Sequence, residues 1–427
     1  MSKIILNPDI CIIGAGSGGL SVASAAAQMG VDVVLIERDK MGGDCLNYGC
    51  VPSKSLLSAA KSIYSHDKAQ KYITNHVPAE VNYSAVKQHV ADVIATIEPH
   101  DSVERFEGLG VKVIKAAGEF VDNETVHAAD YVIKARRFII STGSSAFIPP
   151  IEGLSDVNYQ TNESIFDLPE KPSHLTIIGA GPIGLEMAQA HIRLGCEVTV
   201  IDAFEILGNH HDSFADVIIN QLKAEGVRLL SEVSVEKTSE KNGKIIVSVK
   251  HTDGALEDIS SSHLLVATGR AANISKLGLD KTDIEYDGKG VKVDNSLRTD
   301  AKKVYAIGDV VQIKGATFNP QFTHVANYHA GLVIRSILFR LPTKVNYDFL
   351  PWVIYTDPEL AHVGLNADQA KQRYGTIKIL SAQYEGNDRA IATEKTMGKA
   401  EFYVTTKGHV VGATILGENA GELISIL

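Results

Sequence analysis

The sequence predicts an α/β fold with two Rossmann-like dinucleotide-binding domains and a third, α+β domain. One pattern of strand, glycine-rich loop, helix, strand and acidic residue occurs twice along the chain. The last third of the chain changes to short strand-like segments. The length of 427 residues exceeds one ordinary hydrophobic core and accommodates two or three domains.

The first copy of the pattern lies near the N-terminus. Ile10–Ile13 predicts a strand, residues 20–29 predict a small-residue helix that stops at Gly30, and residues 31–36 predict a strand that ends at Glu37. The loop glycines are Gly14, Gly16 and Gly19. Glycines here allow a tight turn and a close backbone approach to a pyrophosphate, and the acid accepts hydrogen bonds from a ribose.

The second copy lies in the middle of the chain. Residues 175–178 predict a strand, residues 185–194 predict a helix, and residues 197–201 predict a strand that ends at Asp202. The loop glycines are Gly179, Gly181 and Gly184. In both copies the acid follows the last loop glycine by 18 residues (37 − 19 and 202 − 184). One such loop is a weak signal, but two in the same register predict two dinucleotide sites, or one site and a degenerate copy.

Three further strand-like segments end in small or polar residues. The first ends in Thr142-Gly143, the second in Thr268-Gly269 and the third in Gly308-Asp309. We expect Gly143 and Gly269 to let the chain leave its sheet sharply beside a nucleotide. We expect Asp309 to bind a sugar-like hydroxyl chain.

Two cysteines, Cys45 and Cys50, follow the first pattern closely. Three glycines surround them, namely Gly42, Gly43 and Gly49. Pro52 suits the first turn of a helix, and an apolar helical face follows it. We therefore expect the thiols at a helix N-terminus, where the macrodipole lowers the pKa of a thiol. Their spacing suits a small-loop disulfide that is easily reduced.

The remaining composition excludes several classes of protein. Cys11 and Cys196 lie in or beside apolar segments and are expected to be buried packing residues. No second Cys/His pair completes a zinc site, so no metal is expected. A net charge of −10 without a basic block disfavours nucleic acid and anionic membranes as partners. No signal peptide or membrane-length apolar segment is recognised, so a cytoplasmic location is expected.

The cysteine pair and the two loops together resemble the group I pyridine nucleotide–disulfide oxidoreductases, which include dihydrolipoamide dehydrogenase, glutathione reductase and mercuric reductase. The resemblance covers essentially every residue from Asp9 to Leu427. It implies FAD in the first Rossmann-like domain, NAD(P)H in the second, and a homodimer formed by the interface domain. We place the FAD domain at residues 1–146 and 271–345, the NAD(P) domain at 147–270 and the interface domain at 346–427.

Residue roles follow from the same resemblance. It implies that Cys45 is the interchange thiol that meets the substrate and that Cys50 is the charge-transfer thiol against the flavin. Lys54 would lie near flavin N5 and form a buried ion pair with Glu186, and Asp309 would contact the ribityl chain. The other implied cofactor contacts are Gly43, Gly308 and Thr323, the last at the start of a helix under the flavin pyrimidine ring. His324 and His329 on that helix are expected to be structural.

The pyridine nucleotide is expected to be NAD(H) rather than NADP(H). Asp202 at the end of the second strand accepts from a ribose 2′-hydroxyl and repels a 2′-phosphate. Arg193, the nearest arginine in the sequence, belongs to the preceding helix.

The substrate is left with alternatives. The segment Cys50–Lys54, with Ser53, is similar to the lipoamide dehydrogenase and mercuric reductase branches. We favour a small disulfide or dithiol and a dihydrolipoamide dehydrogenase-like activity. The first alternative is reduction of a metal ion, as in a mercuric reductase.

The family's general base is a histidine that a glutamate of the same element orients and that reaches into the partner subunit's active site. Neither residue has a matching position in this sequence. The resemblance places them some tens of residues beyond Leu427. We therefore expect the sequence to be C-terminally incomplete rather than a natural variant. The second alternative rests on this point: a flavin-binding dimer without dithiol turnover.

Overall fold

The computed structural model describes residues 3–208, 212–316 and 319–426. The chain divides into two compact units. The first unit comprises Met1–Pro52, Val90–Phe147 and Arg270–Val345, and the second comprises Ser53–His89, Ile148–Gly269 and Asn346–Leu427. Three of these limits, at 147/148, 269/270 and 345/346, lie within one residue of the boundaries expected between the FAD, NAD(P) and interface domains. The limits at 52/53 and 89/90 match no expected boundary, and the expected NAD(P) and interface domains fall in one unit.

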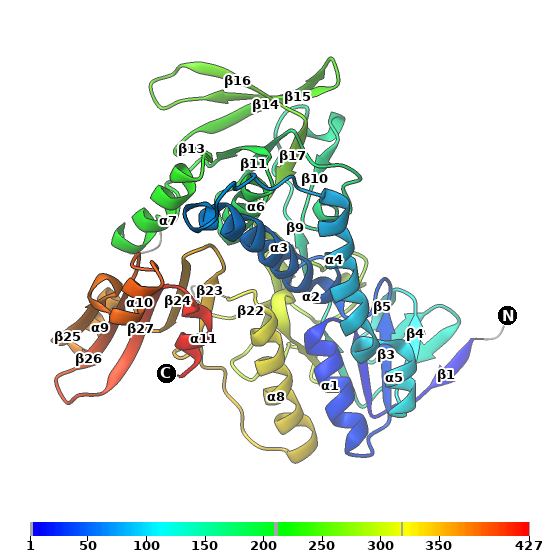
Figure 1. The fold of residues 1–427 in the computed structure, drawn as a ribbon. Helices are drawn as coiled ribbons and strands as arrows, with labels where there is room; N and C mark the ends of the chain where they lie inside the picture. Colours follow the sequence, from blue (N-terminus) through cyan, green and yellow to red (C-terminus); the bar gives the residue numbers. More distant parts are fainter. Residues whose placement is uncertain (1–2, 209–211, 317–318, 427) are drawn as a thin grey trace. The chain divides into compact units, whose positions relative to one another are not determined.

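The first unit is built on a parallel sheet with the strand order β21-β8-β2-β3-β4. Its strands are β2 (Ile10–Ile13), β3 (Val33–Glu37), β4 (Lys112–Lys115), β8 (Arg137–Ile140) and β21 (Val304–Ala306). Figure 1 labels β3 and β4 of this sheet. The three central strands are apolar along nearly their whole length, as expected for a parallel sheet covered on both faces. The long helices α1 (Ser17–Gln28) and α8 (Thr323–Phe339) pack against each other in this unit.

Smaller sheets and helices complete the first unit. One sheet contains β1 (Ile4–Leu6), β7 (Tyr131–Ile133), β6 (Thr125–Ala128) and β5 (Gly118–Asp122), and another contains β19 (Tyr286–Asp287), β20 (Gly290–Val293) and β22 (Val311–Ile313). The strands β9 (Ser144–Ala146) and β18 (Arg270–Ala272) form an antiparallel pair. The short helices are α2 (Gly43–Asn47) and α5 (Val103–Gly108).

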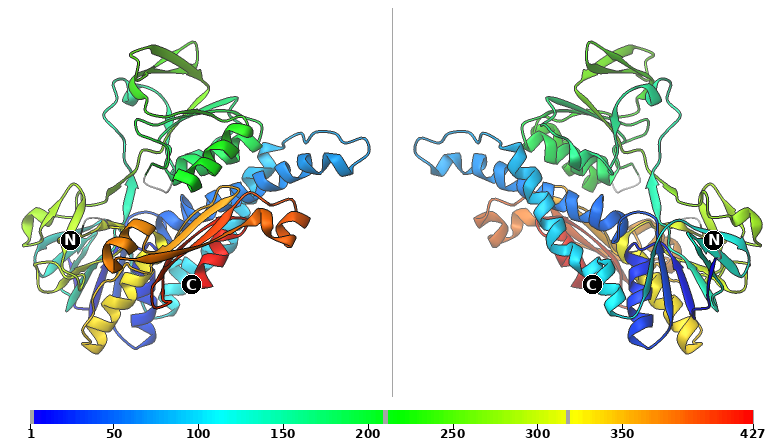
Figure 2. Two further views of the ribbon diagram at one scale, coloured as in Figure 1. Left: turned by 90° about the vertical axis from the view of Figure 1, so that its left-hand side faces the viewer. Right: turned by 90° about the vertical axis from the view of Figure 1, so that its right-hand side faces the viewer.

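Two helices each contain residues that belong to both units. Helix α3 spans Cys50–Lys68 and helix α4 spans Tyr83–Ile97. Between them the chain forms a 3-10 turn, Ala69–Tyr72, and a connection of residues 73–82 (Figure 2).

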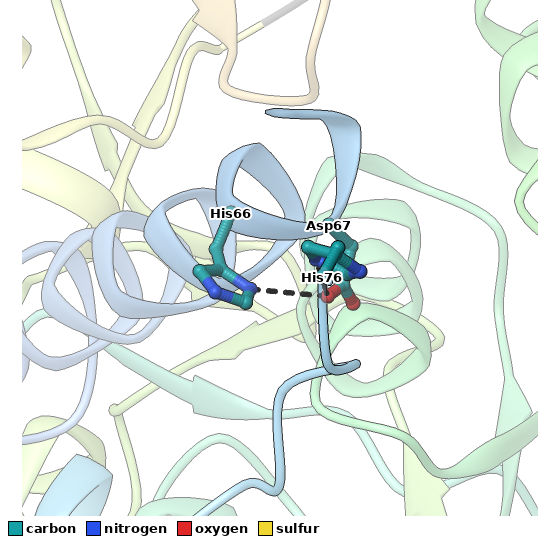
Figure 3. Close-up of side chains that lie close together, drawn as sticks. All are labelled: His66, Asp67 and His76. Carbon is teal, nitrogen blue, oxygen red and sulfur yellow. Dashed lines mark hydrogen bonds and ion pairs between the residues drawn. The ribbon is translucent and has the colours of Figure 1, made fainter. Parts of the chain in front are cut away.

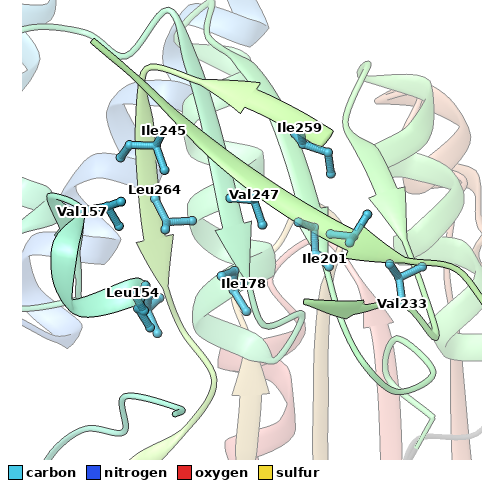
Figure 4. Close-up of a cluster of buried hydrophobic side chains, with 11 residues drawn as sticks. Leu154, Val157, Ile178, Ile201, Val233, Ile245, Val247, Ile259 and Leu264 are labelled. Atoms are coloured by element: carbon cyan, nitrogen blue, oxygen red, sulfur yellow. The ribbon is translucent and has the colours of Figure 1, made fainter. Parts of the chain in front are cut away.

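The second unit repeats the parallel architecture, with the strand order β10-β17-β11-β12-β13. These strands are Tyr159–Gln160, His263–Val266, His174–Ile178, Glu197–Ile201 and Arg228–Leu230, and the helices are α6 (Pro182–Arg193) and α7 (Asp212–Ala224). An antiparallel sheet of β14 (Ser234–Lys241), β15 (Lys244–Lys250) and β16 (Leu256–Ser261) packs on the parallel one. Their shared core contains Ile178, Ile201 and Leu264 from the parallel strands and Val247 from β15 (Figure 4).

The interface region of the second unit is an antiparallel sheet with the order β23-β24-β27-β26-β25 (Figure 2). The strands are Trp352–Ile354, Glu359–Gly364, Val410–Gly417, Lys399–Thr405 and Ile377–Gln383, and the accompanying helices are α9 (Ala367–Tyr374), α10 (Asp388–Ala392) and α11 (Ala420–Leu423). The sheet agrees with the short strand-like segments expected in the last third of the chain. The cis bond Asp357-Pro358 precedes β24 directly.

Helices α1 and α6 begin earlier than expected, and α6 begins at Pro182 rather than at residue 185. Helix α1 begins at Ser17, three residues earlier than predicted, because Gly18 and Gly19 form its first turn despite their poor helix propensity. At the end of the described chain, the short helix α11 is followed by a 3-10 turn, Ile424–Ile426. Leu427 lies outside the described residues. Within the described part of the chain, no helix has the length and apolarity that a bilayer crossing requires.

Candidate functional site

The first glycine loop is held against strand β8 by contacts that exclude side chains. Gly14 has a φ of 108°, and a Cβ atom there would lie 2.4 Å from the carbonyl oxygen of Ser141. A Cβ atom at Gly19 would lie 2.0 Å from the carbonyl oxygen of Gly14. Both positions therefore require glycine, and they let helix α1 begin directly at the end of strand β2.

The start of helix α1 has the features of an anion-binding site. Its N-cap residue is Gly16, no side chain caps the helix, and its first turn contains no acidic residue. A Cβ atom at Gly16 would meet nothing closer than 4.0 Å. The backbone N–H groups and the positive end of the helix dipole thus face room for a pyrophosphate.

The acid at the end of strand β3 fixes this loop. Glu37 is buried, and its Oε2 atom accepts a hydrogen bond of 2.6 Å from the backbone N–H of Ala15. Its Oε1 atom accepts from the N–H of Asp39 at 2.7 Å. A carboxylate accepts about four hydrogen bonds, so two positions are left for the ribose contacts expected of Glu37.

The second glycine loop repeats this geometry. Gly179 has a φ of 107°, and its Cβ would lie 2.4 Å from the carbonyl oxygen of Ala267. A Cβ at Gly184 would lie 1.9 Å from the carbonyl oxygen of Gly179, whereas Gly181 faces open space. Helix α6 begins after Gly181 without a side-chain cap. The loop therefore offers a second helix N-terminus to an anionic group.

Asp202 makes the same kind of backbone contacts to the second loop as Glu37 makes to the first. Its Oδ2 atom accepts from the N–H of Ala180 at 2.6 Å, and its Oδ1 atom accepts from the N–H of Phe204 at 2.9 Å. Arg193 is held elsewhere in the unit, because its side chain pairs with Glu225 at 2.6 Å and with Asp357 at 3.0 Å.

The two Thr-Gly segments lead into the antiparallel pair β9–β18. Gly143 has a φ of 66° and Gly269 a φ of 133°, and both face open space. The hydroxyl of Thr142 donates to the carbonyl oxygen of Asn273 at 2.7 Å, and the Asn273 side-chain amide donates to the Thr142 carbonyl oxygen at 3.0 Å. The chain thus turns sharply out of its parallel sheet at each of these glycines. The two hydrogen bonds between Thr142 and Asn273 join the chain just beyond the two turns.

Asp309 lies in a polar cluster that includes a residue not identified from the sequence. Burial raises the pKa of Asp309, while the Ser144 hydroxyl donates to its Oδ2 atom at 2.7 Å. Arg270 donates to the hydroxyl and to the carbonyl oxygen of Ser144, each at 2.7 Å. Its guanidinium also lies 3.2 Å from Oδ1 of Asp44 and 3.8 Å from Oδ2 of Asp309. The position of Arg270 directly after Thr268-Gly269 was the available signal in the sequence.

The cysteine segment is attached to the first glycine loop. The backbone N–H of Gly42 donates to the carbonyl oxygen of Ala15 at 3.0 Å. Gly43 has a φ of 59°, and its Cβ would lie 2.7 Å from the Cα atom of Gly16. The glycines before the cysteines therefore serve the close packing of this segment against the first glycine loop.

The two thiols lie at the starts of two different helices. Cys45 lies in the first turn of the short helix α2, and Cys50 is the first residue of α3. Cys45 is half-buried and Cys50 is exposed. The Oγ1 atom of Thr323, at the start of helix α8, lies 3.4 Å from the Cys50 sulfur. The expected helix N-terminus at the thiols is thus present for Cys50.

The pKa of Cys45 differs in direction from the expectation. A hydrogen bond with Cys50 raises the pKa of the Cys45 thiol, and burial adds to this. The expectation that a helix N-terminus lowers the thiol pKa is therefore wrong for Cys45, because the hydrogen bond with Cys50 favours the protonated form of the Cys45 thiol. Cys11 and Cys196 are buried, as expected, and burial raises the pKa of both, to about 11 for Cys196.

The two histidines of helix α8 have contacts of a structural kind. Burial lowers the pKa of His329 to about 4, and its Nδ1 atom accepts from the backbone N–H of Gly308 at 3.1 Å. This bond supports the turn at Gly308, whose φ is 72°. His324 is exposed and its ring stacks on Phe322.

Lys54 and Glu186 meet as the sequence predicts. Lys54 Nζ donates to Glu186 Oε2 at 2.7 Å, and the N–H of Tyr355 donates to the other carboxylate oxygen at 3.0 Å. The Glu186 side chain is 5% exposed, but that of Lys54 is 36% exposed. The expectation of a buried pair is therefore correct for the carboxylate only, because the stem of Lys54 ends at the surface of its unit.

The same face of helix α6 binds the segment before strand β24. Gln189 donates to the Asp357 carbonyl oxygen at 3.0 Å and accepts from the Asp357 N–H at 2.7 Å. Burial alone would raise the pKa of Asp357, but the charges of Arg193 and Lys61 outweigh burial and lower it. These contacts fix the backbone that holds Glu186, and no local pattern in the sequence indicates them.

Comparison with known proteins places these features in a family. A family model described as "Pyridine nucleotide-disulphide oxidoreductase" matches residues 8–330. A second, described as "Pyridine nucleotide-disulphide oxidoreductase, dimerisation domain", matches residues 350–427.

Individual relatives agree with these models. A mercuric reductase of Bacillus cereus is 34% identical over 420 residues, which are 97% of this chain and 65% of that protein. The chain thus spans slightly less than two thirds of that relative. A dihydrolipoyl dehydrogenase of Geobacillus stearothermophilus is 31% identical over 99% of this chain and 89% of that protein. The solved Cu(II) complex of the HOCl-induced flavoprotein disulfide reductase RclA from Escherichia coli has a TM-score of 0.86 and 25% identity, covering 98% of this chain and 91% of that one.

Proposed function

Because the chain belongs to the pyridine nucleotide-disulphide oxidoreductases, we propose that it carries electrons between NAD(H), FAD and the Cys45–Cys50 pair, and exchanges them with a small disulfide or dithiol. The observation that carries the proposal is the thiol pair, whose segment is attached to the first glycine loop through Gly42 and Gly43. Family membership implies FAD and a pyridine nucleotide, and the dimerisation domain implies a homodimer.

The residues of the first unit fit FAD. Gly16 and the uncapped start of helix α1 leave room and N–H donors for its pyrophosphate. Glu37 would accept from the adenosine ribose, and Asp309 would bind the ribityl hydroxyls. Arg270 would offer its charge to the pyrophosphate. The bound flavin supplies the two-electron relay between the nicotinamide and the thiol pair.

The residues of the second unit fit NAD(H) better than NADP(H). Gly181 and the start of helix α6 provide the pyrophosphate position. The carboxylate of Asp202 would accept from the 2′-hydroxyl and repel a 2′-phosphate. Arg193 is occupied by Glu225 and Asp357, so it does not offset that repulsion.

The thiol pair would exchange with a disulfide in two steps. The Cys45 sulfur, after losing its proton, attacks one sulfur of the substrate, forming a mixed disulfide and releasing the first thiol. The Cys50 sulfur then attacks Cys45, which releases the second thiol and closes the Cys45–Cys50 disulfide. Two electrons from NADH restore the two thiols, and the reverse sequence oxidises a dithiol.

An anaerobic titration with NADH tests the proposal. The FAD-loaded protein with an oxidised pair should take up two equivalents of NADH, because the flavin and the disulfide each accept two electrons. Cys50→Ser should take up one equivalent, and Cys196→Ser, at a buried packing position, should behave as the parent. The proposal fails if the parent stops at one equivalent.

Metal-ion reduction is the second candidate. Relatives are named mercuric reductase, and one solved relative is a Cu(II) complex. The exposed Cys50 and half-buried Cys45 are soft ligands of the kind that bind such ions. Comparing lipoamide-dependent, Hg(II)-dependent and Cu(II)-dependent NADH oxidation separates the candidates. Activity with an artificial acceptor alone would favour a flavin-binding dimer without dithiol turnover. The cytoplasmic location stays a prediction.

A further inference from the structure

Three side chains of metal-ligating type meet at the end of helix α3 (Figure 3). His66 and Asp67 belong to the last turn of the helix, and His76 comes from the connection that follows it. All three lie within one segment of the second unit, Ser53–His89. Among residues 3–208, 212–316 and 319–426, this is the one group of three or more His, Cys, Asp or Glu side chains with such convergence.

The spacing of the donor atoms suits a single ion. The Nδ1 atom of His66 lies 3.2 Å from Oδ1 of Asp67, and the Nε2 atom of His76 lies 3.7 Å from the same oxygen. One ligand atom from each residue lies within 4.8 Å of the others. A tetrahedral ion with ligands at about 2.1 Å separates its donors by about 3.4 Å, so small side-chain movements complete the geometry.

His76 supplies an independent indication of a ligand. Its side chain is only 11% exposed. Its Nε2 atom is buried and has no hydrogen-bond partner among the described residues. A buried imidazole nitrogen without a partner is costly, and a bound cation would satisfy it.

Asp67 is held in place for such a role. The backbone N–H of Ala79 donates to its Oδ1 atom at 3.1 Å, and this bond is the main reason why the pKa of Asp67 is lowered. Outer hydrogen bonds of this kind orient a metal ligand. The side chains of His66 and Asp67 are 49% and 45% exposed, so water can reach the remaining coordination positions.

We propose that His66, Asp67 and His76 bind one divalent cation of the Zn²⁺ class. Two imidazole nitrogens and one carboxylate suit Zn²⁺ and its transition-metal neighbours, whereas Mg²⁺ and Ca²⁺ prefer oxygen ligands only. The ion would join the end of helix α3 to the connection of residues 73–82. The ion would therefore stabilise the packing of this connection on helix α3. A ligand that binds only the folded form raises the free energy of unfolding.

Zn²⁺ titration of the FAD-loaded full chain tests the site. The parent for this experiment carries Cys45→Ser and Cys50→Ser, because the thiol pair also binds soft metals. Affinity is measured by competition with a chromogenic chelator. We expect one equivalent of Zn²⁺, with affinity reduced at least tenfold by either His66→Ala or His76→Ala. His89→Ala, which removes an exposed histidine of helix α4, is the matched control and should bind as the parent.

A second measurement distinguishes the loss of metal binding from a folding defect in the variants. Zn²⁺ should raise the melting temperature of the parent and of His89→Ala, but not that of His76→Gln, which keeps a polar side chain of similar size. Co²⁺ should give a visible absorption band in the parent that is lost in the same variant. The proposal is overturned if the parent binds no Zn²⁺, or if the His66 and His76 variants bind it as well as the control does.

Discussion

The ammonium group of Lys54 lies 2.7 Å from the carboxylate of Glu186, although 132 residues separate them in the sequence. The ammonium also lies 4.5 Å from the ring centre of Tyr355, whose backbone N–H donates to Glu186. Both carboxylate oxygens thus have a partner. A nearly buried carboxylate with two fixed partners restricts the Lys54 side chain to one orientation.

Glu186→Gln should slow flavin reduction by NADH. With its oxygen facing Tyr355, the glutamine amide would turn its own N–H donors toward Lys54, so the charge-assisted bond is lost. Such bonds contribute about 1.5–3 kcal/mol, which corresponds to a rate roughly 10- to 100-fold lower. Stopped-flow absorbance of the flavin measures the rate.

Lys71→Met is the control for that variant. Lys71 also pairs with a glutamate, Glu394, but both side chains are exposed. Exposed pairs contribute little, so the rate should stay near that of the parent. An unchanged rate in Glu186→Gln would remove Lys54 and Glu186 from the proposed mechanism.

Cys50→Ala should make Cys45 more reactive toward an alkylating reagent. The hydrogen bond with Cys50 is the main cause of the raised pKa of Cys45, so its removal lowers that pKa and increases the thiolate fraction at a fixed pH. At pH 8 we expect alkylation of Cys45 to be several-fold faster than in the reduced parent, and the parent's rate to keep rising above pH 9. Peptide mass spectrometry measures the rate of Cys45 alkylation in both proteins.

The buried thiols provide the internal control for alkylation. Cys11 and Cys196 should stay unmodified in both proteins, because burial raises the pKa of each. Slower alkylation of Cys45 in Cys50→Ala would contradict the direction of the effect.

Asp202→Asn should shift the nucleotide preference toward NADP(H). The change removes the negative charge but keeps one oxygen that can accept from the N–H of Ala180 or Phe204. We expect the ratio of kcat/KM for NADPH to that for NADH to rise roughly tenfold, or about 1.4 kcal/mol. Glu205→Gln, an adjacent exposed acid, should leave the ratio nearly unchanged. A parent that already prefers NADPH would refute the assignment of Asp202.

Arg270→Ala should weaken FAD binding. Its guanidinium bridges Ser144, Asp44 and Asp309 in the proposed flavin site, and without it two carboxylates lose their cation. Flavin retained after desalting should fall, with an affinity loss of roughly tenfold or more. Arg270→Lys should restore part of the affinity, because it keeps the charge but not the planar fork.

Arg136→Ala is the matched control for Arg270→Ala. Arg136 forms a surface pair with Asp9 and is 75% exposed, so its loss should not change flavin retention. Equal retention in both alanine variants would exclude Arg270 from the flavin site.

Much of the nucleotide-binding fold was predictable because its determinants are local. Gly19 and Gly184 pack on the first glycines of their own loops, and Glu37 and Asp202 bond to those loops at a fixed spacing. Gly14 and Gly179 also pack on distant backbone, at Ser141 and Ala267. A motif that closes on itself within one strand–helix–strand unit is visible in sequence. Contacts such as those of Arg270 with Asp44 and Asp309 join distant segments, so no local pattern indicates them.

The repeated Rossmann pattern and the position of the thiol pair were evident from the sequence, and the resemblance to a family implied the pairing of Lys54 with Glu186. The surroundings of each group came from the tertiary structure: a hydrogen bond with Cys50 raises the pKa of Cys45, Glu186 is buried while Lys54 is not, and His76 meets the end of helix α3. These properties depend on which atoms surround a group in space. Residue order does not record those neighbours, whether they come from a distant segment, as for Lys54 and Glu186, or from a nearby one that folds back, as for His76.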